Sequence, residues 1–132
     1  TQDISGWCSI PAVIEGMVDL IDGGWNSIMQ HNHDLTIQGR NVLCERLGIQ
    51  PPCPDEMVAC ISTIQLPGNI PEKEKMHEPD PLHHILSEKY NIQVPVWSWP
   101  SPEGRYLRIS AQLYNSIEQY ERLADALVNE LK

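Results

Sequence analysis

The sequence predicts an α+β fold, a small antiparallel or mixed sheet that is covered by helices and preceded by a long connecting helix. Apolar residues recur every three or four positions in two N-terminal segments and one C-terminal segment, which is the spacing of half-buried helices. Short runs rich in β-branched residues lie between them. The resulting order is two helices, a strand, a helix, two strands and a helix, which is typical of a sheet with helical cover.

The length and composition suit a globular protein. The 132 residues are 41% hydrophobic and 20% charged, which is enough apolar material for a hydrophobic core. We expect residues 1–48 to form the end of a large domain together with a long interdomain helix, and residues 49–132 to form a small C-terminal α+β domain. Because the chain begins with Thr1 rather than Met, we expect it to be a piece of a longer protein.

The two N-terminal helices are separated by a glycine pair. The first is expected over residues 7–21, buried along one side, with Pro11 kinking it or marking its first turn. Glycines 23 and 24 interrupt the pattern, and the second helix follows over residues 25–47 until Gly48 ends it. At 1.5 Å per residue the second helix is about 34 Å long, which suits a helix that connects two bodies.

A strand and a capped helix follow. Residues 57–66 are rich in β-branched side chains, and we expect a strand that ends at Pro67. Asp80 can cap a short helix that has Pro81 at its first position and extends to Tyr90.

Two further strands and a helix complete the predicted domain. Residues 92–97 alternate as a strand, and Pro95, which cannot donate a backbone hydrogen bond, places this strand at an edge. After a turn at residues 101–104, a third strand is expected over residues 105–111. The last helix begins with a capping box at Ser116, the clearest start signal in the chain.

Charge and hydropathy exclude two kinds of partner. Eighteen acidic against nine basic residues give a net charge of -9 without a basic stripe, so we expect no nucleic-acid partner. No segment is apolar enough to span a bilayer and no secretory leader is visible, so we expect a soluble, cytoplasmic protein with no membrane partner. The four cysteines lack metal-binding spacing and are expected to be reduced.

The residues alone offer no self-contained active site. His31 and His33 point about 200° apart on a helix, and His83 and His84 diverge similarly, so no metal site is expected. The sequence has neither a nucleophile-elbow motif nor a glycine-rich phosphate loop. We therefore nominate no catalytic residue within this chain.

Arg108 stands out because it lies in the middle of an apolar strand, between Leu107 and Ile109. Strand alternation sends its side chain away from the buried face. A guanidinium in this position can bind a carboxylate through two parallel hydrogen bonds. The residues alone leave two other possibilities open, a structural pair with an acidic residue of the same sheet and a simple position on an exposed face.

One motif carries a family resemblance. The run LRISAQLYN at residues 107–115, with residues 117–123 after it, resembles the C-terminal signature of class V, fold type I pyridoxal-phosphate enzymes. The most similar branch is the isopenicillin N epimerase-like one, which is related to cysteine desulfurases. Residues 1–3 with the helix that follows, and residues 54–57 with the strand that follows, are also similar to that branch. The likeness covers nearly the whole chain, and the motif that begins at Arg108 is its most specific part.

The resemblance implies a small domain that closes over pyridoxal 5'-phosphate, which is held mainly by a larger preceding domain of a homodimer. The family arginine that matches Arg108 holds the α-carboxylate of an amino-acid substrate. The family threonine that matches Thr1 reaches the cofactor phosphate of the neighbouring subunit, although here the preceding glycine of that motif would lie before residue 1. Gln112, Tyr114 and Asn115 match the motif as residues that shape the strand exit and the start of the last helix.

The cofactor chemistry itself needs a lysine, a carboxylate at the pyridine nitrogen and a stacking ring. We expect all three in the missing N-terminal large domain, so the segment alone should bind no cofactor and be inactive. The reaction could then be an epimerisation, a desulfuration or a transamination. The lysines of this chain lie in a charged loop, at a helix end and at the terminus: Lys73, Lys75, Lys89 and Lys132.

A second interpretation comes from a different functional class. The chain could be a noncatalytic α+β interaction module that keeps the same fold and uses an exposed helix for assembly. The substrate side chain and the reaction type depend on residues outside the segment under the first interpretation.

Overall fold

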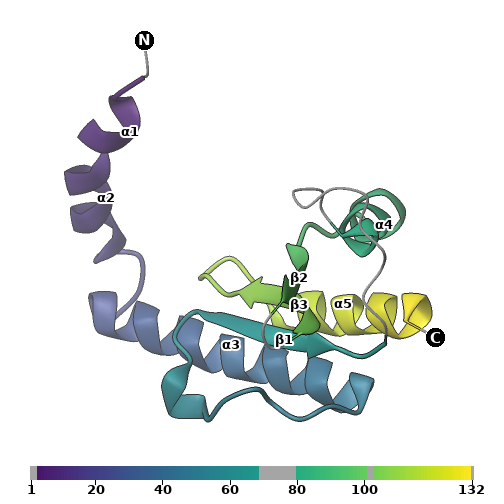
Figure 1. Ribbon diagram of the computed structural model, residues 1–132. Coiled ribbons are helices and arrows are strands. Elements are labelled where there is room, and N and C mark those ends of the chain that lie inside the picture. Colours follow the sequence, from purple (N-terminus) through teal and green to yellow (C-terminus); the bar gives the residue numbers. More distant parts are fainter. Residues whose placement is uncertain (1–2, 69–79, 101–102, 132) are drawn as a thin grey trace.

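The structure is a computed structural model that describes residues 3–68, 80–100 and 103–131 (Figure 1). This part of the chain combines helices with a small antiparallel sheet, which confirms the predicted α+β class. The helices are α1 (Ser5–Cys8), α2 (Ile10–Met17), α3 (Gly24–Leu47), the 3-10 helix η1 (Asp55–Met57), α4 (Pro81–Tyr90) and α5 (Ile117–Glu130). The strands are β1 (Ile61–Leu66), β2 (Val96–Pro100) and β3 (Glu103–Ser110).

The sheet is antiparallel and has the strand order β1-β3-β2, so β3 lies in the centre. Leu107 of β3 pairs with Ile64 of β1 and with Val96 of β2, and all three side chains are buried. Successive side chains of a strand point to opposite faces. Ile109 is accordingly buried on the same face as Leu107, whereas Arg108 is exposed on the other, as the sequence predicted.

One hydrophobic core joins the inner face of the sheet to α3, α4 and α5. Helix α4 contributes Leu82 and Leu86, and α3 contributes Leu35 and Leu43. Burying one leucine side chain stabilises the fold by roughly 1.5–3 kcal/mol, so apolar burial holds these helices on one side of the sheet. The sequence predicts an apolar stripe on the last helix that includes Val128, but Val128 is only half-buried and is not part of the core. The other stripe residues supply the α5 side of the core: Ile117, Tyr120, Leu123, Ala124, Leu127 and Leu131.

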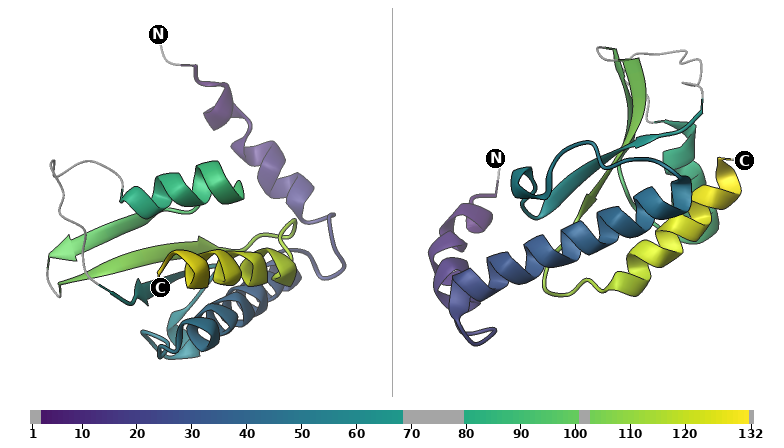
Figure 2. Two further views of the ribbon diagram at one scale, coloured as in Figure 1. Left: turned by 90° about the vertical axis from the view of Figure 1, so that its right-hand side faces the viewer. Right: turned by 90° about the horizontal axis from the view of Figure 1, so that it is seen from below.

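Helices α3 and α5 lie side by side (Figure 2) and approach closely at a glycine. A Cβ atom at Gly39 would lie 2.7 Å from the ring of Tyr120, so the absence of a side chain permits this contact. The hydroxyl of Tyr120 donates a hydrogen bond to the carbonyl oxygen of Ser110 at 2.8 Å. The Tyr120 ring therefore ties α3, α5 and the end of β3 together.

The helix ends follow the signals in the sequence. Asp80 caps α4 by accepting a hydrogen bond from the backbone N–H of Leu82 at 2.9 Å. Gly48 ends α3 in the left-handed conformation, with φ of 66°. The predicted capping box of Ser116 and Gln119 is present at the start of α5.

Helices α1 and α2 do not pack against this core. α1 and α2 extend away from the rest of the chain (Figures 1 and 2), and neither contains a buried residue. The prediction of one helix buried along one side is therefore wrong for this chain, because its apolar side chains, such as Trp7 at 76% exposure, face solvent. Gly23 and Gly24, both with positive φ, turn the chain into α3, and the indole Nε1–H of Trp25 donates to the carbonyl oxygen of Ile14.

Two strand boundaries differ from the prediction at turns. β1 begins at Ile61 rather than at residue 57, because Asp55–Met57 winds into η1. β3 begins at Glu103, inside the predicted turn, of which residues 101 and 102 lie outside the described part.

The start of β2 also differs, and proline is the reason. β2 begins at Val96 rather than at residue 92, directly after Pro95, which has no N–H to donate to a ladder. The carbonyl oxygen of Pro95 still accepts a hydrogen bond from the backbone N–H of Arg108 at 3.2 Å. The predicted edge position of this strand is confirmed.

The variant Gly39→Ala tests the close approach of α3 to α5. Its methyl group would overlap the Tyr120 ring, and overpacking of this kind lowers the free energy of unfolding by about 1–3 kcal/mol. Gly16→Ala in α2 is the matched control, because a Cβ there has no heavy atom within 4 Å. Urea unfolding measures both variants, and equal stabilities would contradict the close contact.

Candidate functional site

Arg108 occupies the centre of the exposed sheet face. It lies on the middle strand, and Thr63 of β1 is its direct partner across the ladder. On its other side, its backbone N–H bonds to the carbonyl oxygen of Pro95. The strand thus fixes the backbone of Arg108 on both sides, while its side chain is exposed.

The guanidinium of Arg108 has no partner among the residues that the structure describes. Across residues 3–68, 80–100 and 103–131 its side chain takes part in no hydrogen bond and no ion pair. The structural ion pair that the sequence left open is therefore not formed within this part of the chain. Every other arginine has a partner: Arg40 pairs with Asp55, Arg46 with Asp125, Arg105 with Asp80, and Arg122 with the backbone carbonyl of Tyr90.

The sheet positions around Arg108 are uncharged. Tyr106 and Ser110 are its neighbours on the same face of β3, since they lie two residues away on either side. On the adjacent strands the nearest positions of this face are Ile61, Thr63, Gln65 and Trp97. The positive charge of Arg108 is thus not neutralised by a neighbouring acid on the sheet, although the whole chain carries a net charge of -9.

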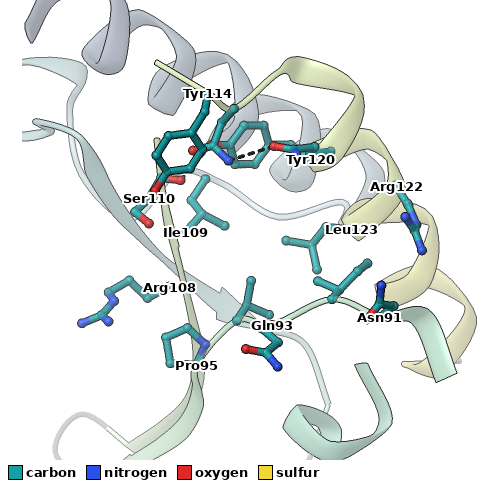
Figure 3. Close-up of a pocket in the computed structure, with 14 residues that line it drawn as sticks. Asn91, Gln93, Pro95, Arg108, Ile109, Ser110, Tyr114, Tyr120, Arg122 and Leu123 are labelled. Atoms are coloured by element: carbon teal, nitrogen blue, oxygen red, sulfur yellow. Dashed lines mark hydrogen bonds between the residues drawn. The ribbon is translucent and has the colours of Figure 1, made fainter. Parts of the chain in front are cut away.

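A cavity of about 340 Å³ opens beside Arg108. Residues 91–95, the end of β3, the loop after it and the start of α5 form its walls. In Figure 3, Arg108 and Ser110 leave β3 on one side, whereas Ile109 points towards Leu123 on the other. Arg108 therefore lines the margin of the cavity, and its guanidinium points outwards to the exposed sheet face, away from Leu123 and Gln93 on the other side of β3 (Figure 3).

The charged side chains that line this cavity are both basic. They are Arg108 and Arg122, and no acidic side chain of the described residues joins them. Arg122 is hydrogen-bonded to the carbonyl oxygen of Tyr90, whereas Arg108 is exposed and has no partner among the described residues. An exposed guanidinium without a partner attracts anionic groups and suits a carboxylate in particular. The arrangement can therefore hold the anionic end of a ligand.

A buried ion pair holds the strand that carries Arg108. Asp80 is completely buried, and Arg105 of β3 is 10% exposed. Nε of Arg105 donates to Oδ2 of Asp80 at 2.8 Å, and Nη2 donates to Oδ1 at 2.5 Å. This two-point contact connects the start of α4 to β3 on the inner face of the sheet.

The described residues do not fit pyridoxal phosphate. Lys89 is exposed, its Nζ lies 2.7 Å from a carboxylate oxygen of Glu130, and it also sits over the ring of Tyr90. Its hydrogen bond to Glu130 raises the pKa of the Lys89 ammonium, whereas a Schiff-base lysine needs a lowered pKa. The remaining lysines lie outside the described residues: Lys73, Lys75 and Lys132.

The predicted contact of Thr1 with a cofactor phosphate also falls outside the described residues and stays a prediction. No group of three metal-ligating side chains in the described ranges could hold a metal ion. His33 and His83 each use Nδ1 to contact a backbone carbonyl oxygen, at 3.0 and 2.8 Å. Burial raises the pKa of the Cys44 thiol, which suits a packed cysteine rather than a nucleophile.

The other motif residues divide into two groups. Asn115 accepts a hydrogen bond from the backbone N–H of Gln112 at 2.9 Å and donates to Gln119 at 2.8 Å, so Gln112 and Asn115 shape the strand exit as expected. Tyr114 differs, because it is 83% exposed and lines the same cavity as Arg108. Sequence reasoning missed this placement, since a loop residue carries no periodic signal. Strand alternation in the sequence did predict that Ser110 and Tyr106 share the face of Arg108, and Ser110 and Arg108 are both exposed in the structure.

No protein-family model matches the chain. Curated proteins match it along nearly its whole length. A chloroplastic protein of Arabidopsis thaliana, named a probable L-cysteine desulfhydrase, is 32% identical and covers 96% of this chain, which corresponds to 28% of that protein. A second protein of this plant, an L-cysteine desulfhydrase, is 30% identical over 100% of this chain and 32% of its own length. The isopenicillin N epimerase of Streptomyces clavuligerus is 32% identical over 96% of this chain and 29% of its own length.

The chain is related to the class V pyridoxal-phosphate enzymes. The resemblance that began with the motif at residues 107–115 is thereby confirmed. The chain spans less than a third of the length of these three relatives. In the described part, no helix has the length and apolar character to cross a bilayer.

The variant Arg105→Met tests whether the buried ion pair holds β3 in place. It would leave the buried carboxylate of Asp80 without its partner, which costs about 3–5 kcal/mol of unfolding free energy. Arg46→Met is the control, because the Arg46–Asp125 pair is 52% and 60% exposed and contributes about 1 kcal/mol or less. Denaturant unfolding compares the two, and similar losses would show that Asp80 does not depend on Arg105.

Proposed function

We propose that this chain is the C-terminal, substrate-binding part of a pyridoxal-phosphate enzyme that acts on an amino acid, and that Arg108 binds the substrate α-carboxylate. One observation carries the proposal. Arg108 presents an unpaired guanidinium at the margin of a cavity, on a sheet face whose neighbouring positions carry no charge.

The chemistry of the guanidinium supports a carboxylate ligand. Its planar fork donates two parallel hydrogen bonds to the two oxygens of a carboxylate, which fixes the orientation of the ligand as well as its charge. Thr63 and Ser110 beside Arg108 have short side chains, so a small ligand can approach the fork. The relatives are named for L-cysteine and isopenicillin N, and both molecules carry a carboxylate.

The cofactor elements belong to the remainder of the parent protein in this proposal. Pyridoxal phosphate, when bound there, supplies an electron sink that stabilises negative charge at the substrate α-carbon. Our chain contributes the carboxylate contact and the domain that carries it, and by itself it is inactive. Epimerisation, desulfuration by a lyase and transamination by a transferase all share this requirement, so the reaction type is left open.

The domain arrangement completes the proposal. Residues 1–48 form the end of the large domain and the helix that leads from it, and residues 49–132 form the small domain. The exposed apolar side chains of α1 and α2 support this division, because the apolar face of a helix is normally covered. The parent is a cytoplasmic homodimer, with Thr1 contacting the cofactor phosphate of the neighbouring subunit.

A second candidate function rests on the same bare helices. A noncatalytic interaction module could use α1 and α2 as its contact surface, since apolar residues such as Trp7 and Ile14 are 76% and 52% exposed. The coding sequence upstream of residue 1 discriminates between the two. A large domain with a cofactor-binding lysine supports the enzyme, and a start codon next to Thr1 supports the module.

In the full-length protein, Arg108→Lys keeps the positive charge and removes the two-point fork. We expect the KM for the amino-acid substrate to rise at least about tenfold, or about 1.4 kcal/mol, while the absorbance spectrum of the bound cofactor stays unchanged. Arg46→Lys is the matched control, because Arg46 pairs with Asp125 at the surface. Steady-state kinetics compare the two variants, and an unchanged KM in Arg108→Lys would overturn the assignment.

A further inference from the structure

Tyr114 has a hydroxyl that bonds to no other described residue. The residue is 83% exposed. Two other tyrosines behave differently, because Tyr90 donates its hydroxyl hydrogen to Glu130 and Tyr120 donates to Ser110. Tyrosine hydroxyls that serve packing normally find such a partner.

The loop that carries Tyr114 is nevertheless firmly held. The backbone N–H of Ala111 bonds to the carbonyl oxygen of Cys60 at 2.9 Å, which continues the ladder past β3. The next residues form a tight turn, in which the N–H of Asn115 bonds to the carbonyl oxygen of Gln112 at 2.8 Å, and the Asn115 side chain accepts from the N–H of Gln112. These contacts fix the backbone on both sides of Tyr114.

The Tyr114 side chain lies on the same side of β3 as the Arg108 side chain (Figure 3). Both residues line the same cavity. Figure 3 shows the Tyr114 ring reaching back over Ser110, on the side of β3 from which Arg108 emerges and opposite Ile109. An exposed phenol and an unpaired guanidinium thus share one margin of the cavity, on a rigid support.

We propose that the hydroxyl of Tyr114 donates a second hydrogen bond to the carboxylate that Arg108 binds, and that Tyr114 thereby positions the amino-acid ligand. This inference rests on the proposed function of Arg108. A carboxylate has two oxygens with about four acceptor sites, and a guanidinium fork occupies two of them. The remaining acceptor sites can accept from a further donor, and the phenol of Tyr114 supplies one without adding charge.

The test uses equilibrium binding to the full-length holoenzyme, measured by calorimetry with two probes. L-alanine carries the carboxylate, and L-alaninamide has the same size but lacks it. Tyr114→Phe keeps the ring and removes only the hydroxyl. We expect it to weaken L-alanine binding about ten- to hundredfold, the effect of one hydrogen bond to a charged group, and to leave L-alaninamide binding unchanged.

Two further variants complete the design. Tyr90→Phe is the control, because its hydroxyl bonds to Glu130 rather than facing the cavity, and it should change neither affinity. The double variant Arg108→Lys, Tyr114→Phe should bind L-alanine only slightly more weakly than Arg108→Lys alone, because residues that hold one group act non-additively.

The outcomes separate this inference from the proposed function. If Arg108→Lys weakens L-alanine binding and Tyr114→Phe does not, the role of Tyr114 is wrong and that of Arg108 stands. If Tyr114→Phe weakens both probes equally, Tyr114 maintains the shape of the site and does not contact the carboxylate. If Arg108→Lys leaves L-alanine binding unchanged, both proposals fall.

Discussion

The structure depends on a sheet that, within the described residues, is covered by helices on one face only. Leu107 and Ile109 direct the inner face of β3 into the core formed with α3, α4 and α5. Strict alternation then obliges the residue between them to leave that core. Arg108 can be charged and unpaired without a desolvation cost, because the same packing that buries its two neighbours keeps its guanidinium in solvent. The two-residue period of the strand thus determines both the burial of Leu107 and Ile109 and the exposure of Arg108.

Two arginines on β3 show how position decides chemistry. Arg105 and Arg108 are three residues apart, so their side chains point to opposite faces. Arg105 points to the inner face, where its guanidinium donates two hydrogen bonds to the buried Asp80. This ion pair connects α4 to β3. Arg108 has no such partner in the described chain and remains available to a ligand. Arg105 therefore stabilises β3 through its contact with Asp80, and Arg108 is exposed on the strand that this contact stabilises.

Local signals in the sequence predicted much of this fold, and tertiary context decided the rest. The glycine stop at Gly48, the cap at Asp80 and the outward direction of Arg108 follow from backbone chemistry within a few residues, so all three were predictable. The burial expected for the first helix was not found, because an apolar pattern indicates that a helix face packs against something but does not identify the surface that covers it. The exposed position of Tyr114 in the cavity was also beyond reach, since it depends on a turn closed by side chains rather than on a period.

The central claim is that the Arg108 guanidinium is kept free for the carboxylate of an amino acid. The remainder of the parent protein could instead bring an acidic side chain to it, which would turn Arg108 into an interdomain ion pair. A crystal structure of the full-length enzyme with a bound amino acid distinguishes the two directly. We predict two hydrogen bonds from the Arg108 guanidinium to the ligand carboxylate. A guanidinium paired with an aspartate or glutamate of the protein, with the ligand carboxylate held elsewhere, would contradict the account.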